Sequence, residues 1–321
     1  MKYTEGKNIM VCAESADKAI IGAALETLSK AAELASAKNE ELIAVVFGKD
    51  TDTAAAFAAG ASKVIVAGED DMQPAAKADI LIKLAEKYQP RAFYMAGTPT
   101  GKMIAPQLAA AFEAGCITDV TGITEDGVYT ALSYNGNVLN DMSMGANLPH
   151  VATVRSGSFA KNLDSSRTGE VLNEDVTASE LKTKVTEAVK EIAESVNLEE
   201  AEIIVAGGRG MGSKENFALV EELAKALGGV VGASRPAIEE EWVSRAHQVG
   251  QSGKIVAPKL YIACGISGAT QHVSGMIGSG YIVAVNKDED ASIFDVADVG
   301  IVGDVTKVLP LMIEEVKKRR A

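Results

Sequence analysis

The chain has 321 residues, of which 47% are hydrophobic and 23% charged, a balance typical of a globular protein with more than one domain. Its net charge of −13 excludes a typical nucleic-acid-binding protein, because such a protein needs a basic face to neutralise phosphates. The three cysteines and three histidines lack metal-ligand spacing, so we expect no metal site. We recognise no signal peptide and no apolar run of membrane length, so we expect a cytoplasmic protein.

The first hundred residues alternate strand-like and helix-like segments. Short apolar runs predict strands at residues 8–13, 42–47, 63–67 and 91–96. Apolar residues recurring every three or four positions predict helices at residues 17–35, 75–88 and 104–113. This alternation predicts a parallel sheet with helices on its faces.

The pattern changes after residue 117. Strand-like segments at residues 128–134, 138–144 and 150–156 lie between Gly, Asn and Pro turns, and we interpret them as an antiparallel extension of the first domain. Residues 160–180 are polar and show no period, which predicts a loop. The charged segment 181–196 carries a thin apolar stripe, which is typical of a linker helix.

A second α/β unit begins near residue 202. Its pattern predicts strands at 203–206, 259–266, 281–286 and 299–302, and helices at 214–227, 269–276 and 305–318. Residues 199–321 hold 16 of the 30 glycines, which indicates that a ligand closely approaches the backbone at the strand ends. We therefore expect two Rossmann-like α/β domains, 1–182 and 199–321, joined by a linker helix at 183–198, with a cofactor in the second.

A glycine-rich turn joins the first strand and helix of this second unit. Gly208 and Gly210 satisfy the G-x-G start of a dinucleotide fingerprint, but Ser213 occupies the position of the third glycine. The turn could cradle a phosphate with its backbone N–H groups or could simply be a tight strand–helix connection. The motif alone favours neither interpretation.

Arg235 follows the small-residue run 231–234 and precedes Pro236, which favours an extended backbone at Arg235. An arginine held in this way can bind an anion or stack on a flat ring. From this segment alone, a surface arginine in a loop is the simpler interpretation.

Two further segments are polar without an evident packing purpose. Residues 248–254 combine two glutamines, a hydroxyl group and two glycines, so that N–H and O–H donors can face a heteroaromatic ring. Residues 264–272 read as a strand, a turn and a short helix, with Ser267 as a candidate N-cap and with Gln271 and His272 on the same turn.

In order and spacing, the segments GGRG, GASRP, QVGQSGKIVAPKLYIACGISGATQH and VAVNKD resemble the FAD domain of electron-transfer flavoprotein α subunits. Many individual residues match the family from residue 203 to 312. The N-terminal half resembles the family only in its general architecture and its length. It implies FAD contacts at sixteen positions: Arg209, Ser234, Arg235, Gln248, Val249, Gly250, Gln251, Ser252, Ser267, Gly268, Ala269, Thr270, Gln271, His272, Asn286 and Asp304.

The resemblance also implies roles for individual residues. Arg235 corresponds to an arginine beside the isoalloxazine ring, Ser252 to a hydroxyl at flavin N5, and His272 to a residue near the N1/O2 edge. Asn286 and Asp304 correspond to positions at the adenosine end.

The implied function is one-electron transfer between flavin dehydrogenases, such as acyl-CoA dehydrogenases, and a downstream acceptor. The implied partner is a β subunit, which would pack on the N-terminal domain of this chain to form a heterodimer. No catalytic acid–base pair or nucleophile is expected, because the cofactor performs the redox chemistry. Some members of the family bifurcate electrons, and these would bind a second flavin and NADH mainly through the β subunit.

From the sequence alone, two other classes of protein remain open. An NAD-binding Rossmann-type oxidoreductase would require the third glycine of the fingerprint, which is absent. A universal-stress-type nucleotide-binding module would fit the first domain only.

Overall fold

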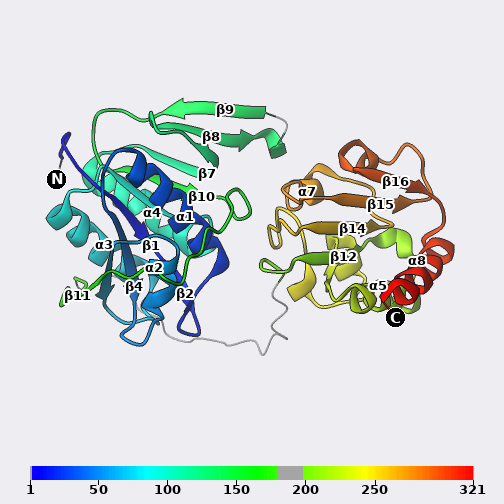
Figure 1. Cartoon of the computed structure of the whole chain (residues 1–321). Helices are drawn as coiled ribbons and strands as arrows, with labels where there is room; N and C mark the ends of the chain where they lie inside the picture. Colours follow the sequence, from blue (N-terminus) through cyan, green and yellow to red (C-terminus); the bar gives the residue numbers. More distant parts are fainter. Residues whose placement is uncertain (1, 137, 180–197, 321) are drawn as a thin grey trace. The chain divides into compact units, whose positions relative to one another are not determined.

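The computed structural model describes residues 2–136, 138–179 and 198–320, and the chain divides into two compact units, Met1–Ala188 and Val189–Ala321 (Figure 1). Each unit contains a largely or wholly parallel sheet flanked by helices, so the predicted α/β fold is confirmed. The predicted linker helix lies outside the described residues.

Among the described residues of the first unit, nine strands form one sheet in the order β11-β5-β4-β1-β6-β10-β7-β8-β9. In chain order these strands are β1 (Ile9–Cys12), β4 (Leu42–Phe47), β5 (Lys63–Ala67), β6 (Ala92–Ala96), β7 (Cys116–Ile123), β8 (Val128–Ser133), β9 (Val138–Ser143), β10 (His150–Val154) and β11 (Glu170–Glu174). Within this sheet, as far as the described residues go, only the β7–β8 and β8–β9 pairs are antiparallel.

Helices cover both faces of this sheet, as Figure 1 shows. They are α1 (Gly22–Ala37), α2 (Thr53–Ala58), α3 (Pro74–Tyr88) and α4 (Pro99–Phe112). Successive residues of a strand point to opposite faces, so Ile9 and Val11 of β1 pack with α1 and α2, while Met10 and Cys12 pack with α3 and α4. All four residues are buried, which explains why this strand appears in the sequence as a continuous apolar run.

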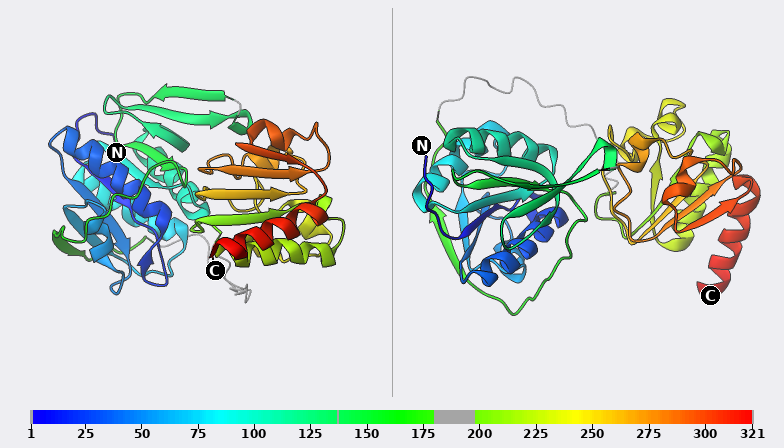
Figure 2. Two further views of the ribbon diagram at one scale, coloured as in Figure 1. Left: turned by 45° about the vertical axis from the view of Figure 1, so that its right-hand side comes forward. Right: turned by 90° about the horizontal axis from the view of Figure 1, so that it is seen from above.

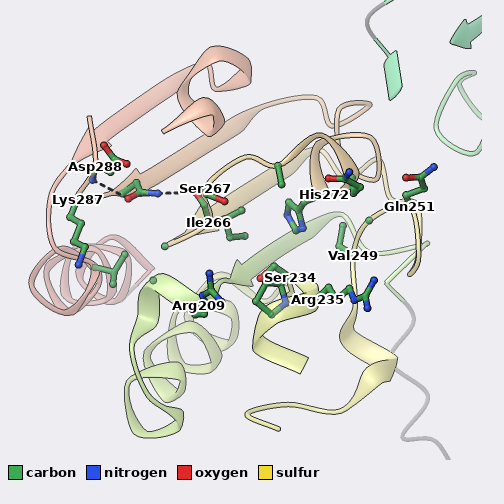
Figure 3. A pocket seen from close by; sticks show the side chains of 18 of the residues that line it. Arg209, Ser234, Arg235, Val249, Gln251, Ile266, Ser267, His272, Lys287 and Asp288 are labelled. Carbon is green, nitrogen blue, oxygen red and sulfur yellow. Dashed lines mark hydrogen bonds between the residues drawn. The ribbon is translucent and has the colours of Figure 1, made fainter. Parts of the chain in front are cut away.

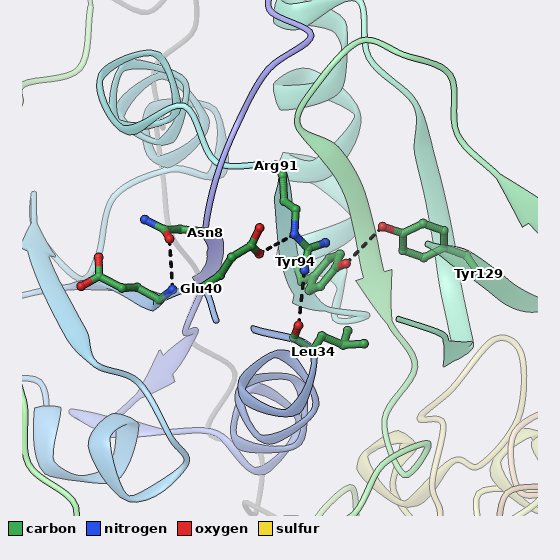
Figure 4. A network of polar contacts seen from close by, with 7 residues as sticks. Asn8, Leu34, Glu40, Arg91, Tyr94 and Tyr129 are labelled. Atoms are coloured by element: carbon green, nitrogen blue, oxygen red, sulfur yellow. Dashed lines mark hydrogen bonds and ion pairs between the residues drawn. The ribbon is translucent and has the colours of Figure 1, made fainter. Parts of the chain in front are cut away.

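A polar network ties the end of α1 to the sheet (Figure 4). The guanidinium of Arg91 forms an ion pair with Glu40 and donates to the carbonyl of Leu34. Beside it, the buried hydroxyls of Tyr94 and Tyr129 lie 3.1 Å apart and share a hydrogen bond. The network satisfies polar groups that would otherwise be buried without partners.

Three predictions for strands in this unit were wrong. Residues 150–156 were expected to extend the sheet in the antiparallel direction, but β10 pairs in parallel with both β6 and β7. Residues 151–154 are buried, as is usual for an interior parallel strand. Part of the expected loop 160–180 is the edge strand β11, whose exposed polar residues gave no apolar pattern, and β7 was not predicted at all.

Two helix starts also differ from the prediction. Residues 15–20 form a small hairpin of β2 (Ser15–Ala16) and β3 (Ala19–Ile20), so α1 begins at Gly22. Helix α4 begins at Pro99, because the hydroxyl of Thr98 caps its first turn by accepting from the N–H of Gly101 over 3.0 Å.

The second unit is built on a five-stranded parallel sheet with the order β13-β12-β14-β15-β16. The strands are β12 (Ile203–Gly207), β13 (Val230–Ala233), β14 (Leu260–Cys264), β15 (Ile282–Asn286) and β16 (Val299–Val302). Strand β13 was not predicted; the other four were. Helices α5 (Lys214–Leu227) and α8 (Val305–Arg320) lie side by side on one face (Figure 2).

The opposite face of this sheet is covered mainly by loops and by the four-residue helix α7 (Thr270–Val273). No helix in the described part of the chain has the length and apolar character needed to cross a membrane.

Candidate functional site

A cavity of about 710 Å³ lies at the carboxyl edge of the second sheet, where the turns after β12, β13, β14 and β15 meet (Figure 3). Ligands of open α/β sheets bind at this edge, because parallel strands bring segments from distant parts of the sequence together there. The volume lies within the range of small-molecule and cofactor sites.

The cavity brings together thirteen of the sixteen predicted residues. They are Arg209, Ser234, Arg235, Val249, Gly250, Gln251, Ser252, Ser267, Ala269, Gln271, His272, Asn286 and Asp304. Gln248, Gly268 and Thr270 do not line it. Gln248 is buried and lies outside the set of residues that line the cavity. Gly268 packs so tightly that an added Cβ would lie 2.1 Å from the backbone nitrogen of Ile293.

Seven lining residues were not predicted: Gly210, Pro236, Gly265, Ile266, Lys287, Asp288 and Val305. Most of them are immediate neighbours of predicted residues in the same turns. Lys287 and Asp288 change the chemistry of the site, because they add a cation and a carboxylate directly after β15. Their place directly after the strand, next to Asn286, was the signal available in the sequence.

The glycine-rich turn after β12 packs against the turn after β14. The N–H of Gly208 donates to the carbonyl of Cys264 over 2.8 Å, and the N–H of Gly210 donates to Gly265 over 2.9 Å. A Cβ on Gly208 would lie 2.4 Å from the carbonyl oxygen of Gly265. These glycines permit close contact between two turns, which supports the tight-turn interpretation over a phosphate cradle built from their N–H groups.

Arg235 begins the short helix α6 (Arg235–Glu239), so the expected extended backbone at Arg235 was wrong. The extended residue is Ser234, with φ −78° and ψ 156°. Pro236 is tolerated in the first helical turn, where backbone N–H groups have no intrahelical partner. The Nε of Arg235 donates to Glu239 over 2.8 Å, and both side chains are exposed.

The polar loop 248–254 is fixed to two other elements. The N–H of Val249 donates to Ala233 at the end of β13 over 2.9 Å, and the N–H of Gln251 donates to Gln271 in α7 over 2.8 Å. These bonds hold the side chain of Ser252 at the cavity wall without using its hydroxyl proton.

His272 is 7% exposed and lies in α7, whose N-cap is Ala269 and not the expected Ser267. Its Nε2 shares a hydrogen bond of 3.0 Å with the hydroxyl of Tyr261, and its Nδ1 has no hydrogen-bond partner among the described residues. Burial lowers the pKa of His272 to about 4, and a weak backbone hydrogen bond with Val249, which falls short of full hydrogen-bond geometry, opposes this effect. The ring is therefore neutral at pH 7.

The opposite end of the cavity is shaped by Asn286 and Asp304. The amide of Asn286 donates to the carbonyl of Ile266 over 2.9 Å and accepts from the N–H of Asp288 over 3.0 Å. Asp304 precedes α8 and accepts from the N–H and the hydroxyl of Thr306, which lower the pKa of its carboxyl group. Both residues thus hold the backbone around the cavity in addition to lining it.

Three cations line the cavity: Arg209, Arg235 and Lys287. Among the described residues, Arg209 and Lys287 take part in no ion pair within 4.0 Å. The carboxylates of Asp288 and Asp304 line the cavity too, and the charge of Lys287 helps to lower the pKa of Asp304. Three cations together with backbone and hydroxyl donors suit a ligand that carries both phosphates and a polar heteroaromatic ring.

Fold and site together define a two-unit α/β protein whose second unit binds a nucleotide-type cofactor. A family model described as the electron transfer flavoprotein FAD-binding domain matches residues 197–277, and a model described as the electron transfer flavoprotein domain matches residues 9–180.

Full-length relatives agree with these matches. The chain is 40% identical to an electron transfer flavoprotein subunit alpha from Thermoanaerobacterium thermosaccharolyticum, over 97% of this chain and 98% of the relative. It is 40% identical to the subunit alpha from Megasphaera elsdenii, over 100% and 99% of the two chains. It is also 40% identical to a Protein FixB from Clostridium saccharobutylicum, over 99% and 98%. The chain belongs to the electron-transfer flavoprotein α-subunit family, and its cofactor is FAD.

Proposed function

We propose that FAD lies along this cavity with its isoalloxazine ring at the end formed by Arg235, Ser252 and His272. The diphosphate would lie near Arg209 and Lys287, which form no ion pair within 4.0 Å in the described part of the chain. The adenosine would lie near Asn286 and Asp304. The observation that carries this proposal is that one cavity combines three cations and two carboxylates with hydroxyl, amide and imidazole groups.

When bound, FAD accepts and donates the electrons, and the side chains of this chain control its binding and its potential. Ser252 presents a hydroxyl proton to the ring. Arg235 places a positive charge beside it, which favours the more negative, reduced cofactor. His272 supplies a neutral polar group and contributes no charge, because burial keeps it deprotonated.

We further propose that the chain acts in the cytoplasm as one half of a heterodimer with a β subunit that packs on its N-terminal unit. The electron donors would be flavin dehydrogenases, for example acyl-CoA dehydrogenases. Family membership supports the β subunit as partner, since relatives over nearly their whole length are named as α subunits.

Co-expression with an electron-transfer flavoprotein β subunit from the same organism tests the proposal. The purified complex should show the visible absorption of flavin, and denaturation should release FAD from the wild-type complex. A complex in which both Arg209 and Lys287 are replaced by Met should retain much less FAD. Release of NAD instead of FAD would favour the Rossmann-type oxidoreductase and overturn the proposal.

The same preparation distinguishes two forms of the function. Two FAD molecules per heterodimer, with oxidation of NADH, would identify an electron-bifurcating complex. One FAD per heterodimer, without oxidation of NADH, would identify a simple electron carrier.

A further inference from the structure

Tyr261 and His272 form a buried hydrogen-bonded pair behind the cavity. Tyr261 is the second residue of β14 and is fully buried, while His272 belongs to α7 and lines the cavity. The hydroxyl oxygen of Tyr261 lies 3.0 Å from Nε2 of His272, and the two ring centroids are 6.2 Å apart. Tyr261 was not among the residues expected to matter for the cofactor.

The direction of this hydrogen bond decides which imidazole nitrogen carries the proton. The only partner found for the Tyr261 hydroxyl in the described part of the chain is Nε2 of His272. If Nε2 carried a proton and donated it, the hydroxyl proton of Tyr261 would be buried without an acceptor. The lone pair of Nδ1 would also remain unpaired, since no described residue donates a hydrogen bond to it.

The opposite direction leaves fewer groups unsatisfied. If the Tyr261 hydroxyl donates, Nε2 accepts with its lone pair, and only the N–H at Nδ1 still needs an acceptor. A buried donor without an acceptor costs about 1–3 kcal/mol, so the arrangement with one unsatisfied group is preferred over the arrangement with two. A charged imidazolium is the least favourable state, because it would also bury a positive charge.

We propose that Tyr261 is a positioning residue that donates its hydroxyl proton to Nε2 of His272 and thereby fixes the neutral imidazole as the tautomer protonated on Nδ1. The strand β14 and the helix α7 hold the two side chains, so the ring cannot turn over without losing this bond. His272 then carries no charge, and its N–H at Nδ1 is buried.

The consequence for the cofactor rests on the proposed function. The Tyr261 bond holds the imidazole that lines the cavity neutral and in one orientation, so His272 presents the same uncharged side chain to the oxidised and to the reduced cofactor. Arg235 then supplies the positive charge at the end of the cavity proposed to hold the isoalloxazine ring. Tyr261 acts on the cofactor only through the orientation and tautomer of His272.

Nitrogen-15 NMR of histidine-labelled, full-length protein tests the tautomer directly, with and without FAD. The chain has three histidines, so His150→Gln and His247→Gln variants assign the signals of His272. In the wild type at pH 7 we expect a pyridine-type shift for Nε2 and a pyrrole-type shift for Nδ1. A protonated Nε2, or an imidazolium, would overturn the proposal. Because the spectrum of the FAD-free protein suffices, this result does not depend on whether FAD binds as proposed.

Tyr261→Phe removes the hydroxyl and keeps the ring. In this variant we expect the Nδ1-protonated signature of His272 to be lost or mixed, and the affinity for FAD to fall by about two- to tenfold. Tyr94→Phe is the matched control, since Tyr94 is equally buried, hydrogen-bonds to Tyr129 and makes no bond to His272. An unchanged His272 signature in Tyr261→Phe would show that Tyr261 has no positioning role. If Tyr261→Phe does not fold, the wild-type spectrum alone decides.

Discussion

The side-chain amide of Gln248 donates a hydrogen bond to the hydroxyl oxygen of Ser252 over 2.9 Å. Gln248 is 5% exposed and does not line the cavity, whereas Ser252 does. Because the oxygen of Ser252 accepts this bond, its own proton remains available to an acceptor in the cavity. Gln248 therefore orients the hydroxyl that faces the cofactor.

Replacement of Gln248 by Met should weaken FAD binding by about two- to tenfold, because it removes the bond that orients Ser252. FAD affinity is measured by titration of the FAD-free protein. Ser252→Thr keeps the hydroxyl and is the control that should bind nearly normally.

A double-mutant cycle tests whether Gln248 acts through Ser252. In a Ser252→Ala background, the further change Gln248→Met should have little effect on FAD affinity. An equal loss in both backgrounds would mean that Gln248 supports the site in some other way.

The position of Gln248 shows which features of the site could be predicted from the sequence and which could not. The resemblance identified most of the residues that line the cavity, because polar residues and glycines at fixed spacing in strand-end turns carry that information. It could not separate residues that face the cavity from those behind it, since Gln248 and Ser252 lie in the same loop. That distinction depends on contacts with β13 and α7 that are distant in the sequence.

The fold of the N-terminal unit shows a similar limit. Strands β1, β4, β5 and β6 are buried apolar runs, and the sequence predicted them correctly. The direction of β10 and the existence of β11 depend on pairing with strands far away in the sequence. Local composition carries little information about such pairing.

Gly268, in the turn before α7, and Thr270, the first residue of α7, should respond differently to replacement by Ala. Gly268 has φ +88°, and a Cβ there would lie 2.1 Å from the backbone nitrogen of Ile293, so Gly268→Ala should destabilise the second unit severely. Thr270 is exposed and does not line the cavity, so Thr270→Ala should keep both stability and FAD affinity. Thermal unfolding with FAD titration checks both variants. Normal stability of Gly268→Ala would contradict the close packing of this turn.

Glu26 in α1 is largely buried and accepts the N–H of Gly157 over 2.7 Å. Burial raises the pKa of its carboxyl group, while the N–H of Gly157 and the charge of Lys161 oppose the rise. Because the folded state disfavours the charged form, the stability contributed by Glu26 is greatest below its ordinary pKa and is lost as the pH rises through the folded pKa.

We therefore expect Glu26→Gln to be more stable than the wild type at pH 7, with the difference disappearing near pH 4. Glu26→Ala should be less stable by about 1–3 kcal/mol, because it leaves the N–H of Gly157 without its acceptor. Urea unfolding at several pH values measures both effects. Glu33→Gln, on the exposed side of the same helix, is the control and should change stability by less than about 0.5 kcal/mol. A Glu26→Gln effect that does not vary with pH would show that the carboxylate carries no burial penalty.

The charge of Arg235 should influence the potential of the flavin, and its exposure limits the size of that influence. Its side chain is 67% exposed and is paired with Glu239 over 2.8 Å. Exposed charge interactions contribute about 0.2–1 kcal/mol. Since 1.4 kcal/mol corresponds to about 59 mV for one electron, removal of the charge should shift the potential by about 10–40 mV.

Arg235→Ala should lower the flavin potential by this amount, because a nearby cation stabilises the reduced, more negative cofactor. Arg235→Lys should recover only part of the shift, since an ammonium group cannot cover a ring as a planar guanidinium does. Glu239→Gln should move the potential in the opposite direction by removing the countercharge. Spectroelectrochemical titration of the FAD-loaded protein measures all three, with Arg245→Ala as the control, because Arg245 does not line the cavity. Identical potentials for Arg235→Ala and the wild type would place Arg235 away from the ring and reverse the proposed orientation of FAD.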